Sequence, residues 1–86
     1  MARYFFDFIT SSLSTHDDEG SDCSDRSAIS EKALSALCEI AADHPQRYMN
    51  QDLRIDVRNK TDQIVMSASL RLSTHWLVAS EHIEAA

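Results

Sequence analysis

One segment with helical periodicity, residues 26–43, constrains the fold of this chain more than any other feature. Its apolar residues recur at spacings of three and four, which places them on one face of a helix. They include Ile29, Ala33, Ala36, Leu37 and Ile40. Asp25 or Ser24 offers an oxygen to the free N–H groups of the first turn. Pro45 disfavours helical geometry at the preceding residue, so the sequence predicts one amphipathic helix that ends at His44.

Three other segments alternate between apolar and polar residues, a pattern typical of strands that bury one face. They are residues 3–10, 53–58 and 63–73. Successive side chains of a strand point to opposite faces. The even-numbered residues of the first and third segments and the odd-numbered residues of the second therefore face the helix. We expect the opposite face, which carries Arg54, Asp56 and Arg58, to be solvated.

Two connecting segments have the composition of loops. Residues 11–24 are rich in Ser, Thr and Asp and contain Gly20, the only glycine of the chain. We expect this segment to be mobile and to hold, near the glycine, a short additional strand. Residues 59–62 read Asn-Lys-Thr-Asp, and Asn and Asp tolerate left-handed backbone angles, so this segment is expected to close a hairpin.

These elements predict a two-layer α+β fold in which the helix, about residues 26–43, covers one face of a mainly antiparallel sheet. The sheet has three or four strands, in the chain order β-(β)-α-β-β. Residues 1–74 form a single domain and residues 75–86 a C-terminal tail, either docked or used in self-association. We favour a strand order with the first strand beside the last. The alternative, with the first strand beside the penultimate one, is expected to be a right-handed parallel crossover.

The chain of 86 residues carries a formal net charge of −6, concentrated in one segment. Asp17, Asp18, Glu19, Asp22 and Asp25 supply nearly all of it. No Lys or Arg cluster is present to bind a phosphate backbone, so we expect no nucleic-acid partner. The N-terminal residues lack the long apolar region of a signal peptide, and no window has the roughly 18 apolar residues of a transmembrane helix. We therefore expect a cytoplasmic protein without a membrane partner.

The acidic segment is the candidate site for a metal ion, with Asp17, Asp18, Glu19 and Asp22 as candidate ligands. Carboxylates around a glycine turn suit Ca²⁺. The alternating acidic residues and the distal Glu of an EF-hand are missing, however, so a solvated acidic loop is the favoured interpretation. The four histidines have no metal-binding spacing; they are His16, His44, His75 and His82. Cys23 and Cys38 are interpreted as free thiols.

No catalytic pattern is found in the sequence. There is no G-x-S-x-G turn, no Ser-x-x-Lys pair and no Cys with a recognisable His partner. A single glycine also rules out the glycine-rich phosphate loops. We expect a protein that is not an enzyme and needs no cofactor.

Apolar residues on the predicted outer face indicate a protein-interaction surface instead. Phe5, Ile9 and Val65 lie on that face among charged residues, and Trp76 lies in the tail. Exposed apolar patches often mark interfaces. The sequence therefore favours a small interaction or regulatory module that acts as a homodimer or binds a protein partner. A cation-binding acidic loop is the alternative function.

Three short motifs carry a family resemblance: Arg-Tyr-Phe-Phe at residues 3–6, Asp-Glu-Gly at residues 18–20 and Asp-Val-Arg-Asn at residues 56–59. Together they resemble a family of small uncharacterised proteins of rhizobia and related alphaproteobacteria, described as a domain of unknown function. The chain departs from that pattern at Asp62, where a turn glycine is common, and in its longer tail. The resemblance implies a bacterial cytoplasmic protein and supplies no activity, cofactor or catalytic residue.

Overall fold

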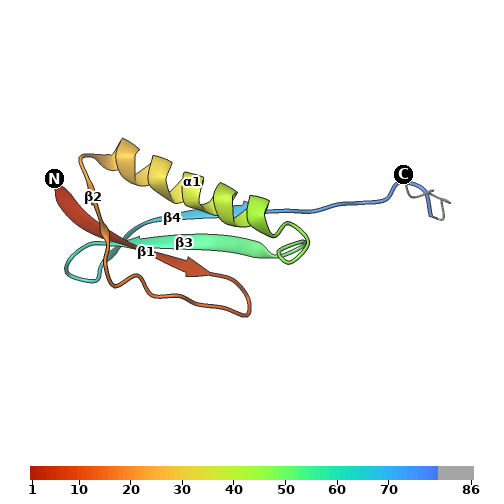
Figure 1. The fold of residues 1–86 in the computed structure, drawn as a ribbon, viewed down its shortest axis with the longest axis horizontal. Coiled ribbons are helices and arrows are strands. Elements are labelled where there is room, and N and C mark those ends of the chain that lie inside the picture. Colours follow the sequence, from red (N-terminus) through yellow and green to blue (C-terminus); the bar gives the residue numbers. More distant parts are fainter. Residues whose placement is uncertain (80–86) are drawn as a thin grey trace.

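A computed structural model describes residues 1–79 of the chain as one helix packed on one face of a four-stranded antiparallel sheet (Figure 1). The elements follow in the order β1 (Ala2–Ile9), β2 (Ser21–Cys23), α1 (Arg26–Asp43), β3 (Asp52–Arg58) and β4 (Ile64–Arg71). The predicted α+β class and chain order are therefore confirmed. Asp25 caps α1, because its Oδ1 accepts a hydrogen bond of 2.8 Å from the Ala28 N–H group.

The expected strand order is wrong. The sheet has the order β2-β1-β3-β4, so β1 lies beside the penultimate strand and not beside the last one. The pairing of β1 with β3 is also antiparallel, contrary to the parallel crossover that we expected for this order. The reason is that residues 10–25 return the chain to the start of β1 before α1 begins (Figure 1). Helix α1 then runs in the same direction as β1, and β3 runs in the opposite direction beside β1.

The core lies between α1 and the face of the sheet predicted from the strand parity. Leu37 of α1 and Leu53 and Val57 of β3 are its largest fully buried side chains. Burial of each such side chain contributes roughly 1.5–3 kcal/mol. Tyr48, from the connection between α1 and β3, also joins the core and packs edge-on against Phe8, with ring centroids 6.0 Å apart. Periodicity did not identify Tyr48, because it lies outside the helix and the strands.

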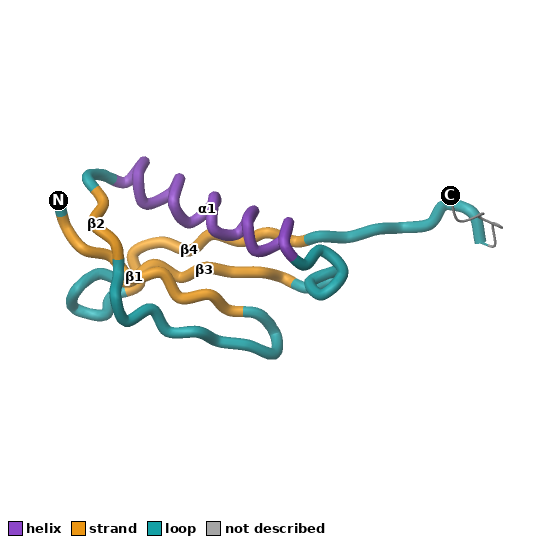
Figure 2. Tube along the Cα trace, in the orientation of Figure 1, coloured by secondary structure: helices purple, strands orange, loops and turns teal. Residues whose placement is uncertain are grey.

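Residues 73–79 extend away from the two layers (Figure 2). Within the described residues, the last backbone hydrogen bond to the domain is at Leu72, whose carbonyl accepts the Asn50 N–H group at 2.8 Å. Trp76 is 77% exposed, and Leu77 and Val78 are exposed as well. The described part of the tail is thus not docked on its own domain, and self-association remains a prediction.

Candidate functional site

A pair of charged side chains lies on the face of the sheet opposite α1. Asp7 is in the middle of β1, and Arg58 ends β3. Nε of Arg58 donates to Oδ2 of Asp7 at 2.7 Å, and Nη2 donates to Oδ1 at 3.1 Å. The two side chains are only 11% and 13% exposed. The result is a bidentate ion pair of the kind that adds geometric specificity to the electrostatic attraction.

The remaining groups of the Arg58 guanidinium are also occupied. Nη1 donates to Oδ1 of Asp62 at 2.8 Å, and Nη2 donates to the carbonyl oxygen of Asp17 at 3.0 Å. Nε2 of His16 lies 3.3 Å from Nη2. The guanidinium carbon lies 5.1 Å from the ring centroid of Phe5, a cation–π distance. With these partners, the guanidinium presents no vacant edge to an anionic ligand.

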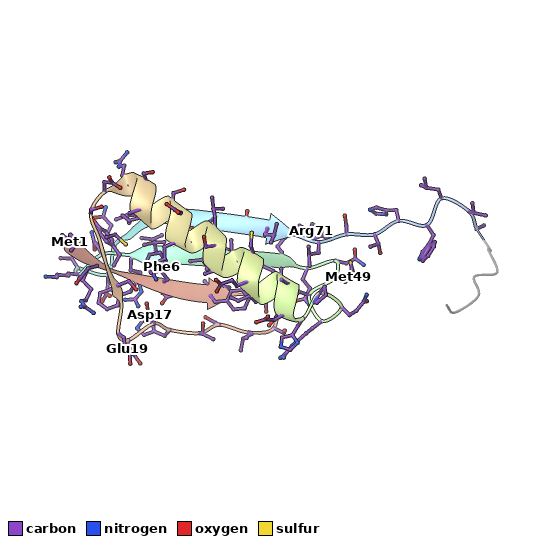
Figure 3. All side chains as sticks on the ribbon, turned by 45° about the horizontal axis from the view of Figure 1, so that its top comes forward. Met1, Phe6, Asp17, Glu19, Met49 and Arg71 are labelled. Atoms are coloured by element: carbon purple, nitrogen blue, oxygen red, sulfur yellow. The ribbon has the colours of Figure 1, made fainter. Side chains whose placement is uncertain are left out.

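Asp17 attaches the acidic loop to β1. Its Oδ2 accepts the Phe6 N–H group at 2.9 Å, and its Oδ1 accepts the N–H groups of Glu19 and Gly20, each at 3.1 Å. Its own N–H group donates to Oδ1 of Asp7 at 2.9 Å. Figure 3 shows Asp17 beside the sheet and Glu19 at the outer turn. The loop that we expected to be mobile is held to the sheet by these bonds.

Gly20 completes this loop in a conformation that other residues rarely adopt. Its φ is +74°, and a Cβ atom there would lie 2.9 Å from both the Phe5 ring and the Tyr4 carbonyl oxygen. A side chain at this position would thus be both strained and obstructed. The glycine allows the loop to pass close to β1.

The hydrogen bonds of this cluster shift two carboxyl pKa values in the same direction. The Arg58 guanidinium is the main cause that lowers the pKa of Asp7 below its ordinary value of 3.8. Burial alone would raise the pKa of Asp17, but the N–H groups of Phe6, Gly20 and Glu19 together lower it. The same Asp7 carboxylate raises the pKa of Arg58 above its ordinary value. Asp7, Asp17 and Arg58 are therefore all charged at neutral pH.

A second carboxylate, Asp56, lies directly opposite Asp7 in the pairing of β1 with β3. Like charges at opposing positions are destabilising unless each has a partner. Asp56 has two: Nε of Arg54 lies 3.0 Å from its Oδ1, and the Ser67 hydroxyl donates to the same oxygen. Asp56 and Arg58 are both buried, so the expectation of a solvated outer face is wrong for these two residues. Asp56 is held by Arg54 and Ser67, and Arg58 contacts Asp17 of the acidic loop.

The candidate metal ligands do not converge in the structure. Asp17 uses both oxygens for backbone N–H groups, Asp22 lies 3.5 Å from Nε of Arg3, and Asp18 lies 3.7 Å from Nε2 of His16. Within residues 1–79, no group of three or more His, Cys, Asp or Glu side chains is arranged to hold a metal ion. His82 lies outside the described residues. Cys23 is buried in β2, and Cys38 is exposed on α1.

The four residues predicted for the interaction face come from separate places. Phe5 is half-buried beside Arg58, and Ile9 is half-buried at the other end of β1. Val65 lies on β4, where it is 44% exposed, and Trp76 is in the tail. Strand β3 lies between β1 and β4, and its Arg58 is the residue opposite Phe5.

The structure instead presents a feature that periodicity did not identify, the free edge of β4. The direction in which the backbone N–H and C=O groups of β4 point can be followed across the sheet from β1. The Phe6 and Phe8 N–H groups bond to the loop, at 2.9 Å to Asp17 Oδ2 and 3.3 Å to Thr15 Oγ1. Backbone groups of an antiparallel pair alternate in direction along a strand. The intervening residues of β1, Asp7 among them, therefore bond to β3.

The same alternation continues across the sheet. Asp56, opposite Asp7, bonds to β1, so its neighbours Ile55 and Val57 bond to β4. Their partners on β4 are Ala68 and Met66. The alternate residues of β4, whose backbone groups point away from β3, are Ser67, Ser69 and Arg71. No strand of residues 1–79 pairs with this edge.

Comparisons with known proteins give one match. A family model described as a domain of unknown function, DUF6894, matches residues 3–71. No curated protein matches the chain, and no solved structure matches it. Among the described residues, no helix is both long and apolar enough to cross a membrane.

Proposed function

The chain belongs to the DUF6894 family, a domain of unknown function, and from its geometry we propose that it is a non-catalytic protein-interaction module. It binds an extended segment of polypeptide along the free edge of β4. The observation that carries this proposal is the set of backbone groups of Ser67, Ser69 and Arg71 that point away from the sheet. Addition of a strand to an open edge is a recurring mode of peptide recognition.

The composition of β4 supports this role. Natural edge strands are usually blunted by lysine, proline, β-bulges, inward-pointing charges or very short length. β4 spans eight residues and contains no lysine or proline, and its one charged residue is Arg71. Ile64 and Val65 are 57% and 44% exposed beside the edge. The register with β3 shifts at Val65, so the edge is irregular there, but residues 66–71 form a regular edge without such protection, which favours pairing with another strand.

The charged cluster supports a non-catalytic role. Catalytic acids and bases need a pKa near the working pH and access to substrate. The pKa of Asp7 is lowered away from that range, and its carboxylate is occupied by Arg58 and Asp17. The cluster acts as a structural clamp that holds the loop and positions β1. No observation favours the cation-binding alternative.

We also place the module in the bacterial cytoplasm, on the motif resemblance and on the two free thiols. Cys38 is exposed and unpaired in the structure, which suits a reducing compartment.

Site-specific photocrosslinking in cells tests the proposed function. A photoreactive residue at Ser69, beside the free edge, is expected to give a discrete protein adduct. The same residue at Ser35, exposed on α1, serves as the matched control and is expected to give none. Absence of an adduct from position 69, or equal adducts from both positions, contradicts binding through the β4 edge.

A further inference from the structure

We propose that the strand bound by β4 is β4 of a second copy of this chain, paired antiparallel about Ala68, so that two sheets form one continuous eight-stranded sheet. The inference rests on the proposed function and names its partner. It is carried by the self-complementarity of the edge, in its backbone directions, its charge and its exposed apolar residues.

The backbone directions fit pairing about Ala68. Ser67 and Ser69 both present N–H and C=O groups to the free edge, and this register places Ser67 opposite the partner's Ser69. Residues of the same parity then face each other, so helix-facing side chains of one copy continue the helix-facing side of the other. A shift by one residue would place apolar side chains beside polar ones and is therefore excluded.

The charge of the edge is also compatible with this register. Arg71 is the one charged residue of β4, and the pairing places it opposite the partner's Val65. A register centred on Arg71 would oppose two guanidinium groups, which is destabilising. Pairing about Ala68 avoids this repulsion.

Apolar residues at the start of β4 match those at its end. In this register Met66 lies opposite the partner's Leu70, whereas Ile64 lies before the register shift at Val65 and outside the regular pairing. Met66 and Leu70 are both half-buried. An antiparallel pair brings the start of one strand to the end of the other, so the edge supplies both halves of each apolar contact. A foreign strand would need to reproduce this sequence.

A cavity beside β4 lies where the partner's Leu70 arrives. It has a volume of about 410 Å³ and is lined by Tyr4, Arg26, Ile29, Ser30, Val65 and Met66. Because Met66 and Val65 line it, this cavity opens at the start of β4. The partner's Leu70, opposite Met66, approaches this cavity and extends the apolar contact from the strand to the N-terminal half of α1.

One flank of α1 borders the same edge. Nζ of Lys32 lies 5.8 Å from the ring centroid of Phe6, so the Lys32 flank faces β1. Ser30 lines the cavity with Met66, so the opposite flank faces β4. Leu34, four residues after Ser30, lies on this flank and is 49% exposed. Pairing of the two β4 strands brings the Leu34 flanks of both helices toward each other.

Sedimentation and amide hydrogen exchange of the purified protein test the inference directly. Between low micromolar and near-millimolar concentration, we expect a monomer–dimer equilibrium. The N–H groups of Ser67, Ser69 and Arg71 should gain protection as the dimer forms. Those of Met66 and Ala68 should be protected at all concentrations, because they bond to β3.

Ser69→Pro and Ser69→Ala form the matched pair of variants. Proline removes an N–H group that points to the free edge and leaves the ladder with β3 intact. Each dimer loses two backbone hydrogen bonds, so the dissociation constant should rise about thirtyfold. Ser69→Ala keeps the N–H group and should dimerise like the parent. If the proline variant fails to fold, Ser69→Lys places a lysine of each copy at diagonal positions across the same seam and leaves the Ser67 hydrogen bond to Asp56 in place, with Ser35→Lys as the charge-matched control.

Two outcomes overturn the inference. One is a strictly monomeric protein at near-millimolar concentration, and the other is a dimer in which the Ser67, Ser69 and Arg71 amides stay unprotected. If either occurs while position 69 still crosslinks to a different protein in cells, the proposed function stands and only the identity of its partner is wrong. Failure of both experiments rejects the proposed function as well.

Discussion

Replacement of Asp7 by Asn tests the charged clamp on the outer face. The substitution keeps the size of the side chain and removes its charge. The carboxylate accepts three hydrogen bonds, from Nε and Nη2 of Arg58 at 2.7 and 3.1 Å and from the Asp17 N–H group at 2.9 Å. An amide has one oxygen and one NH₂ group, and the NH₂ group must then face one of these donors. At least one donor therefore loses its partner.

The expected cost of Asp7→Asn is about 2–3 kcal/mol, because hydrogen bonds to charged groups contribute roughly 1.5–3 kcal/mol and this pair is largely shielded from water. Arg58 keeps Asp62 and the Asp17 carbonyl oxygen as partners, so the cost stays below that of a fully isolated buried charge. For a domain of this size, 2 kcal/mol corresponds to a fall in Tm of about 8–16 °C.

Urea melts of Asp7→Asn and Asp22→Asn measure this effect against a matched control. Asp22 is half-exposed and lies 3.5 Å from Nε of Arg3. Exposed ion pairs contribute about 0–1 kcal/mol, so Asp22→Asn should change stability by less than 1 kcal/mol. Both variants remove one negative charge from the same part of the sheet. A difference between their stability losses therefore reports the clamp and not the change in net charge.

The pH dependence gives a second readout of the same clamp. Because the pKa of Asp7 lies below 3.8 in the folded protein, the unfolded chain binds the proton first as the pH falls. The contribution of Asp7 to the free energy of unfolding is therefore complete above about pH 4. It is lost as the pH falls through the pKa of Asp7 in the folded protein. Asp7→Asn should therefore make stability less dependent on pH in this acidic range, while the pH dependence that is due to Asp17 remains. The clamp would be refuted if Asp7→Asn and Asp22→Asn lost equal stability, or if Asp7→Asn left the pH dependence of stability in the acidic range unchanged.

Three further predictions concern stability. Leu37→Ala should cost about 2–5 kcal/mol in a urea melt, since Leu37 is fully buried, whereas Leu34→Ala should cost under about 1 kcal/mol in the monomer; similar losses would disprove the assigned helix face. Gly20→Ala should destabilise by more than about 1 kcal/mol because of its positive φ and the close Phe5 ring, and a neutral result would contradict the loop geometry. Ser67→Ala should cost about 1 kcal/mol by removing the donor to buried Asp56; thermal melts that match the parent would show that this bond contributes nothing.

Local patterns in the sequence determined the elements of this protein. The apolar spacing between Asp25 and Pro45 predicted α1, and the structure has the helix at residues 26–43 with Asp25 as its cap. Strand parity predicted which residues face the helix, including Phe8 and Leu53, because side-chain direction alternates with every residue. Asp62 adopts a φ of 64°, consistent with the predicted turn. Each of these properties depends on residues close together in the chain.

The tertiary structure alone decided how those elements are combined. The order of the strands depends on the course of residues 10–25 between β1 and α1. The alternation of side chains along each strand does not determine that course. The bond between Asp7 and Arg58 joins residues 51 positions apart, so no local spacing indicated that the outer face is a closed cluster. For the same reason, alternation could not distinguish β4, which has a free edge, from a central strand. Pairing between distant segments is set by packing of the whole chain, and this packing leaves the edge of β4 open.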